Sequence, residues 1–252
     1  MEGRGRAAAP FSMTVEITFG SLLLVALWEL CRPRRRREFP AFRRQLGNLG
    51  IWLFNVIVAA LIFQPAQRFR FWPASPLGFA AGFLVLDLLT YGIHRAKHAV
   101  PLFWRFHALH HSDPDVDVTT SVRHHPIEFL GTTGCFWLAV AGLGVPVTIS
   151  ATYGLADFAV AAAVHGNVRW PAWLERLLRP VVITVDLHLV HHSIVTGEAN
   201  ANFGAVLSVW DRLFGTLAQP RSAAPVFGVD ELSRTDACRP LPMLLTPWRV
   251  PR

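Results

Sequence analysis

Apolar residues in this chain gather into five stretches of a length suited to transmembrane helices. Crossing the hydrocarbon of a bilayer takes roughly 20 helical residues. The last two stretches are predicted to form a hairpin or a broken pair, joined by Gly142, Gly144 and Pro146. The pattern predicts an all-α fold, a multi-span transmembrane helical bundle. The predicted spans are Val15–Cys31, Leu46–Phe63, Leu77–Ile93, Phe129–Ser150 and Ala151–Val164.

Two further segments lie outside the spans. Pro171–Ile183 alternates apolar residues with Glu175, Arg176 and Arg179, which predicts an amphipathic helix at the membrane interface. The Pro-rich C-terminal tail, residues 218–252, is predicted to lie over the globular face.

The composition agrees with a membrane protein. Of the 252 residues, 52% are hydrophobic and 16% charged, whereas a soluble domain carries about 25% charged residues. No cleavable signal sequence is evident, so the first span is expected to be retained. Three widely separated cysteines exclude an iron–sulfur cluster and disfavour a disulfide framework. They are Cys31, Cys135 and Cys238.

The formal net charge of +7 predicts a membrane orientation and not a nucleic-acid partner, since no basic face of a soluble module is present. Lys97 is the only lysine among the 24 basic residues. Such a bias towards arginine is typical of a GC-rich coding sequence and favours a bacterial source. Seven arginines between residues 32 and 44 place this loop in the cytoplasm by the positive-inside rule. Counting spans from there puts every histidine-rich segment on the cytoplasmic face, as a helical cap.

All eleven histidines fall into five short clusters near predicted span ends. Residues spaced i, i+3 and i+4 share a helix face, and neutral imidazole is a good ligand for iron, zinc and copper. Ten or so imidazoles exceed what one ion can hold, so the count favours two ions with four or five each. The clusters are His94 and His98; His107, His110 and His111; His124 and His125; His165; and His188, His191 and His192.

Each of these motifs, taken alone, has a simpler interpretation than a two-metal centre. A single HxxxH is more often a surface or capping pair, and one HxxHH can be a structural zinc site. A bis-histidine haem needs isolated histidines in the middle of apolar helices, whereas these lie at span ends. Two HxxHH motifs and one HxxxH on one predicted face make an arrangement without metal improbable.

The chain resembles the fatty acid hydroxylase/sterol desaturase superfamily of membrane di-iron oxygenases over about residues 80–217. The resemblance rests on HRAKH at 94–98, HALHH at 107–111, the His-Pro-x-Glu element at 125–128, HLVHH at 188–192, Asn-Phe-Gly at 202–204 and WDRLFGT at 210–216. It divides the chain into N-terminal spans with the Arg-rich loop (1–79), a catalytic domain (80–217) and the tail (218–252).

The resemblance implies two iron ions, with O₂ as co-substrate and no catalytic residue separate from the ligands. His124 departs from the family, which often has an aromatic residue there, and so does Leu189, where a polar residue is common. The implied ligands are His94, His98, His107, His110, His111, His125, His165, His188, His191 and His192.

Several acidic residues accompany the histidines. Asp87, Glu128, Asp186 and Asp211 are candidates for partners that fix imidazole tautomers, with capping or salt bridging equally plausible. Three further acids after the second cluster are expected to lie in a solvated turn. They are Asp113, Asp115 and Asp117.

Three functions fit these features. The preferred one is hydroxylation of an unactivated C–H of a membrane lipid, with electrons from a separate ferredoxin, rubredoxin or cytochrome-type protein. The second is desaturation or ether-lipid cleavage on the same site. The third, a non-catalytic membrane metal-binding protein, is disfavoured because the middles of the spans are nearly all apolar, Asp157 being the main exception.

Overall fold

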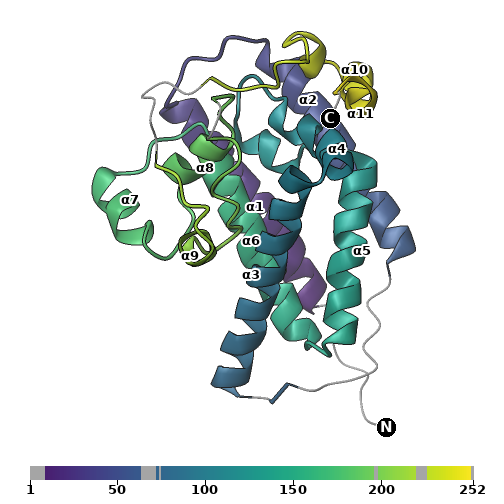
Figure 1. The fold of residues 1–252 in the computed structure, drawn as a ribbon, viewed down its shortest axis with the longest axis vertical. Helices are drawn as coiled ribbons and strands as arrows, with labels where there is room; N and C mark the ends of the chain where they lie inside the picture. The colour runs from purple at the N-terminus through teal and green to yellow at the C-terminus, as the bar shows by residue number, and fades with distance from the viewer. Residues whose placement is uncertain (1–8, 64–71, 74, 196–197, 220–225, 251–252) are drawn as a thin grey trace.

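The computed structural model describes residues 9–63, 72–73, 75–195, 198–219 and 226–250. Five long helices run along the molecule, with shorter helices gathered at one end (Figure 1). The long helices are α1 (Ala9–Cys31), α2 (Ala41–Ile62), α3 (Pro76–Ala99), α5 (Pro126–Gly142) and α6 (Val147–His165).

The described residues are helical apart from connecting segments and two isolated β-bridges, which confirms the predicted all-α class. Between and after the long helices lie two 3₁₀ helices and several short α-helices. They are α4 (Pro101–His111), η1 (Val118–Val122), α7 (Ala172–Leu178), α8 (Val185–His191), α9 (Val209–Leu213), η2 (Asp236–Cys238), α10 (Pro240–Leu244) and α11 (Thr246–Arg249).

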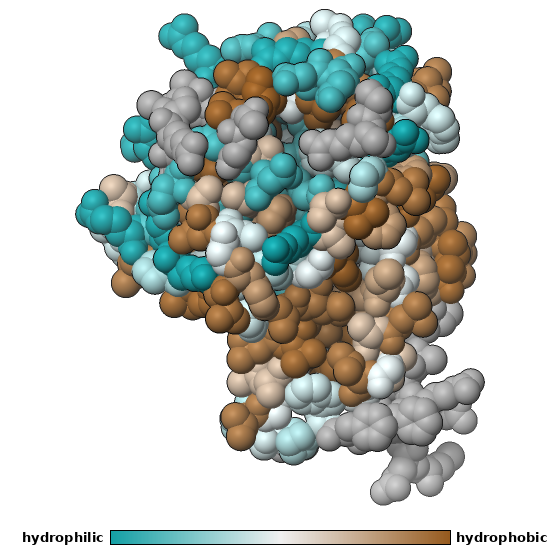
Figure 2. Space-filling model, viewed as in Figure 1, coloured by the Kyte–Doolittle hydropathy of each residue, from teal (hydrophilic) through white to brown (hydrophobic). Residues whose placement is uncertain are grey.

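Within the part of the chain that the structure describes, three helices, α2, α3 and α6, are long and apolar enough to cross a membrane. The first predicted span lies within α1, and the fourth overlaps α5, which has 17 residues. Large apolar side chains project outward from the long helices, such as Leu24, which is 69% exposed. Figure 2 shows the consequence, a broad apolar region below a polar upper part. An apolar outer surface of this extent is typical of protein that faces lipid.

The predicted boundary between the last two spans, at Ser150 and Ala151, was wrong. Helix α5 ends at Gly142 and α6 begins at Val147. Gly144 adopts a positive φ of 62°, a conformation that glycine takes without steric cost, and Pro146 caps the next helix. The predicted turn residues themselves therefore separate α5 from α6.

The predicted interfacial helix is shorter than expected, with α7 covering residues 172–178 of the predicted 171–183. In the tail, α10 packs against α2 and α11 against α4, so these helices cover the histidine-rich end. The main apolar core lies between α3, α5 and α6, around Leu86, Val140 and Tyr153. This core fixes the helix ends from which the histidines project.

Candidate metal centre

Nine of the ten histidines predicted as ligands converge at the polar end of the bundle, in two adjacent groups. Five side chains form one group, whose potential ligand atoms all lie within 4.8 Å of one another. Four more form a second group under the same limit. The five-histidine group is His94, His98, His107, His111 and His191, and the four-histidine group is His110, His165, His188 and His192.

Each HxxHH motif contributes to both groups. His107 and His111 of α4 belong to the five-histidine group, whereas His110 belongs to the other. In α8, His191 belongs to the five-histidine group, whereas His188 and His192 belong to the four-histidine group. The ring centroids of His111 and His192, one from each group, are 4.5 Å apart. The two groups are therefore neighbours, as a two-metal centre requires.

Acceptors on the outer side of the five-histidine group fix its tautomers. His94 Nδ1 donates to the Phe203 carbonyl at 3.0 Å, and His191 Nδ1 donates to the Ala201 carbonyl at 2.8 Å. A carbonyl only accepts, so the proton is on Nδ1 and Nε2 carries a lone pair. The Nε2 atoms of His98, His107 and His191 are buried without a hydrogen-bond partner. These buried lone pairs point toward one another, and no hydrogen-bond donor satisfies them. Such an arrangement fits a metal ion between them.

One short segment, the acceptor loop (residues 200–204), supplies most of these acceptors. Besides the two carbonyls, it places Asn200 Oδ1 3.3 Å from His98 Nδ1. Asp211 accepts hydrogen bonds from the backbone N–H groups of Phe203 and Gly204, both at 2.8 Å. A Cβ on Gly204 would collide with the Leu207 carbonyl, so only glycine fits there. The loop thus orients three imidazoles of one group.

The four-histidine group is centred on His165. Its Nδ1 donates to the Ala161 carbonyl at 2.7 Å, so its Nε2 carries no proton. That Nε2 lies 3.2, 2.9 and 3.1 Å from the Nε2 atoms of His110, His188 and His192. One lone pair cannot satisfy three donors, whereas imidazoles bound about 2.0–2.1 Å from one ion place neighbouring nitrogens about 3 Å apart. The donor set fits a metal.

Burial keeps the imidazoles in their neutral, ligating form. It lowers the pKa of His107 to about 4, despite the opposing effect of Glu128, and the pKa of His191 to about 3. Burial and repulsion between rings hold the pKa values of His110, His188 and His192 well below the ordinary value. These side chains are neutral at physiological pH, and neutral imidazole binds metals.

Glu128 is the acid that contacts the histidines, as predicted. Its Oε1 accepts from His107 Nδ1 at 2.7 Å and from Lys97 Nζ at 2.9 Å, and lies 3.4 Å from His124 Nδ1. Glu128, His107 and His124 are close enough to hold an ion themselves. Because His107 Nδ1 already donates to Glu128, we interpret this trio as the outer support of the five-histidine group.

Glu128→Gln is expected to lower metal affinity about 10–100-fold, the usual effect of losing an outer partner of a ligand. The neutral amide removes the charge that faces His107 Nδ1–H and Lys97. Loss of bound metal to a chelator measures the change. Glu38→Gln, at a side chain 69% exposed, is the matched control. Equal chelator resistance in both variants would contradict this role.

His125 does not join either group. Its Nδ1 accepts from the Ile127 N–H at 3.2 Å, capping α5, and its Nε2 lies 3.3 Å from the Leu244 carbonyl. Both ring nitrogens are therefore directed to backbone. His124 instead stacks on His110, with centroids 4.8 Å apart. The structure therefore places the predicted ligand His125 apart from both groups, because the N-cap position turns its ring away.

His125→Asn is accordingly expected to leave the metal content unchanged. Asparagine is among the best N-cap residues, so it can keep the bond to the Ile127 N–H. The metal content per chain of the purified variant, compared with the wild type, measures this. Loss of an equivalent of metal would restore His125 as a ligand.

The remaining predicted acids serve the scaffold. Asp87 accepts from Trp210 Nε1 at 2.8 Å and from the Val206 N–H at 3.1 Å. Asp186 forms salt bridges with Arg34 and Arg179, the alternative weighed for it. Together with Asp211, these residues hold the loops that carry the site.

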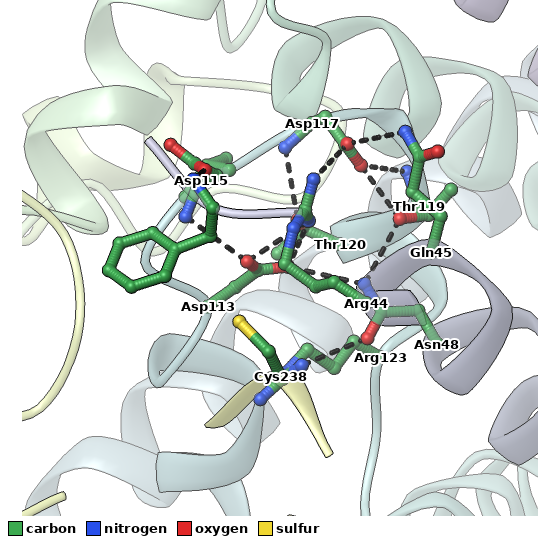
Figure 3. Close-up of polar contacts among 12 residues, drawn as sticks. Arg44, Gln45, Asn48, Asp113, Asp115, Asp117, Thr119, Thr120, Arg123 and Cys238 are labelled. Atoms are coloured by element: carbon green, nitrogen blue, oxygen red, sulfur yellow. Dashed lines mark hydrogen bonds and ion pairs between the residues drawn. The ribbon is translucent and has the colours of Figure 1, made fainter. Parts of the chain in front are cut away.

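Asp113 and Asp117 do not lie in a solvated turn as predicted, because both are buried against Arg44 of α2 (Figure 3). Arg44 Nη1 donates to Asp113 at 2.8 Å, and its Nη2 is paired with Asp117. Arg123 donates to the Leu109 carbonyl and to Asn48. Two guanidinium groups thus offset two carboxylates. Asp115 lies beside them and accepts from the Glu38 and Phe39 N–H groups.

Two residues that the sequence analysis did not single out also support the site. Glu29 in α1 accepts from the Asn167 N–H at 2.6 Å and from the Val118 N–H at 2.8 Å, fixing the turn after His165. Lys97 holds Glu128. An ionisable residue within or at the end of an apolar helix was the available signal, since such a residue needs a partner.

Comparison with known proteins places this centre in a family. Residues 79–216 match the family model described as fatty acid hydroxylase. The chain is 32% identical to an ornithine lipid hydroxylase of Rhizobium tropici over 169 residues, 65% of this chain and 50% of that protein. It is 28% identical to the alkylglycerol monooxygenase of Homo sapiens over 144 residues, 56% of this chain and 31% of that protein.

A fatty acid hydroxylase of a Lecanicillium species is 28% identical over 191 residues, 68% of this chain and 52% of that protein. The chain therefore spans about half or less of the length of these relatives. No solved structure matches it. Since the family model covers more than half of the chain and includes every histidine of both groups, the chain belongs to the fatty acid hydroxylase family, within the fatty acid hydroxylase/sterol desaturase superfamily.

Proposed function

We propose that this protein is a membrane di-iron oxygenase that hydroxylates an unactivated C–H of a lipid. The observation that carries the proposal is the pair of adjacent groups of neutral imidazoles, with unpartnered Nε2 atoms in the five-histidine group and Nε2 atoms that converge on His165 in the four-histidine group. Imidazole also suits zinc and copper. Iron is favoured because the relatives are named as hydroxylases and monooxygenases.

Bound iron would supply the activation of O₂ and the oxidation of the C–H bond, and the protein supplies position and environment. The five-histidine and four-histidine groups would hold one ion each. The acceptor loop and Glu128 orient the rings, and burial excludes water from the centre. Apolar helices lead from the centre into the lipid-facing region, so a lipid can approach from the bilayer.

Electrons would come from a separate protein of the ferredoxin, rubredoxin or cytochrome type. The three cysteines lie on α1, α5 and η2, and no pair of them is bonded. By the positive-inside rule, we place the centre on the cytoplasmic side of a bacterial membrane. The arginines that give this orientation have a second role here, since Arg34 and Arg44 form ion pairs within the cap.

To test the reaction, a host with and without the gene is grown under ¹⁸O₂, and the lipids extracted from the two are compared. A lipid that gains one ¹⁸O atom only when the wild-type protein is present supports hydroxylation, and His191→Ala serves as the inactive control. A lipid that instead loses two hydrogens would replace hydroxylation by desaturation. Cleavage of an ether lipid is the second candidate, favoured by the similarity to alkylglycerol monooxygenases. An unchanged lipid profile would refute an oxygenase function.

A further inference from the structure

A cavity of about 540 Å³, which no histidine of the five- or four-histidine group lines, lies between α2, the start of α5 and the C-terminal tail. We call it the lipid groove. Its wall on α2 includes Gly47, Gly50 and Phe54, and the opposite wall includes Pro126 and Leu244. The volume is within the range of about 300–1,000 Å³ typical of small-molecule sites. The groove is thus large enough for part of a ligand.

The lining of the groove is apolar, and its α2 wall belongs to a surface directed outward. Leu46 and Phe54, which line it, are 59% and 55% exposed, and Phe42 nearby is 76% exposed. Helix α2 is also one of the helices able to cross a membrane. An apolar cavity that opens on such a helix favours an acyl chain over a polar solute.

Two guanidinium groups border the same groove. Arg43 is exposed at the start of α2, and the Arg239 side chain is 71% exposed. Asp236, the nearby acid, is 3.8 Å from Arg239 but is also paired with Arg249 at 3.0 Å. The net charge around the groove is therefore positive. Arginines beside an apolar cavity at a membrane surface complement an anionic headgroup.

We propose that the lipid groove binds an anionic glycerophospholipid of the membrane, with an acyl chain between α2 and the tail and the headgroup phosphate on Arg43 and Arg239. This lipid is a resident partner and not the substrate, because no histidine of either group lines the groove. By filling the space between α2 and α10, it holds the tail against the helix that carries Arg44. The proposal stands independently of the reaction at the metal centre.

Gly50 allows a direct test. A Cβ at this position would meet no atom within 4 Å, so a side chain can start here without a clash, and Gly50→Leu adds its bulk to the wall of the groove. Gly131 of α5 is also exposed with no atom within 4 Å of its Cβ, but it does not line the groove, so Gly131→Leu is the matched control. Arg36→Gln is the charge control, since Arg36 is exposed and lies outside the groove.

Native mass spectrometry of the purified full chain in mixed micelles counts retained phosphatidylglycerol against phosphatidylcholine. We expect the wild type to retain one phosphatidylglycerol per chain. Arg43→Gln and Arg239→Gln should each lower the preference for phosphatidylglycerol over phosphatidylcholine about fivefold. Gly50→Leu should retain neither lipid. The two controls should match the wild type.

Three outcomes would overturn the proposal. The first is wild-type protein that shows no preference for phosphatidylglycerol. The second is retention by Gly50→Leu, or by the two arginine variants, that equals the wild type. The third is recovery of the retained lipid with an added oxygen atom, which would make it the substrate. A protein that retains the lipid but shows no oxygenase activity would count against the proposed function alone. Failure of the lipid groove and failure of the proposed function are therefore distinguishable.

Discussion

If the protein holds the two iron ions that we propose, replacing His165 by alanine is expected to remove one of them and to abolish turnover. His165 Nε2 is the atom on which the other three nitrogens of the four-histidine group converge, at 2.9–3.2 Å. Its loss leaves three imidazoles, and the Nδ1 atoms of His110, His188 and His192 have no acceptor to orient them. The five-histidine group keeps all of its side chains.

Iron analysis of purified variants checks this expectation. His165→Ala should retain about one iron per chain, His191→Ala should lose the ion of the other group, and the double variant should retain none. His125→Asn, a histidine outside both groups, is the control and should retain the wild-type content. Circular dichroism and gel filtration establish that the variants are folded. Full iron and full turnover in His165→Ala would refute the assignment of the four-histidine group.

Arg44→Met is expected to lower the free energy of unfolding by about 3–5 kcal/mol, because it leaves two buried carboxylates without their cation. Arg44, Asp113 and Asp117 are all buried, with side chains at most 1% exposed. Burial would raise the pKa of Asp117, but Arg44 and the hydrogen bonds from Thr119 and Gln45 lower it overall. A lowered pKa gives stability above the unfolded-state value of about 3.9. That stability is lost as the pH falls towards the folded-state value.

Denaturant titration of the detergent-solubilised protein measures the loss, with Arg36→Met as the exposed control. The double variant Arg44→Met, Asp117→Asn should recover much of the stability, since the remaining Asp113 carboxylate then faces the Arg123 guanidinium and the charges in this part of the network balance. A change in Arg44→Met as small as in Arg36→Met would contradict the proposed role of the ion pairs. We also expect Arg44→Met to weaken metal retention, because Asp113 lies two residues after His111.

The acceptor loop could be predicted only in part. The Asn202-Phe203-Gly204 sequence was identified through the family resemblance, but its contacts were not. Asn202 takes a positive φ of 57°, and its Nδ2 donates to the Leu187 and Ala218 carbonyls. The groups that orient His94 and His191 are backbone carbonyls. Every residue has a carbonyl, so no side-chain pattern can reveal which one faces an imidazole.

The sequence by itself determined the helical class, the family, the set of histidines and the apolar stretches, which include the three helices long enough for a membrane. These features are local, because hydropathy and ligand spacing are properties of short segments. Tertiary structure decided which histidines lie in the same group. Positions i+3 and i+4 lie on opposite sides of position i around a helix of 3.6 residues per turn. His110 and His111 therefore diverge into different groups.

The long-range contacts were likewise beyond the sequence. Arg44 meets Asp113 across 69 residues, and the pairing converts what looks like a solvated acidic turn into a buried network. His125 was predicted as a ligand because it matches the His-Pro-x-Glu element of the family resemblance, and its neighbour His124 has the same ligand chemistry. Only the packing of α5, which uses His125 as its N-cap, distinguishes them. Burial and partner geometry depend on how distant segments pack, and spacing along the chain does not encode it.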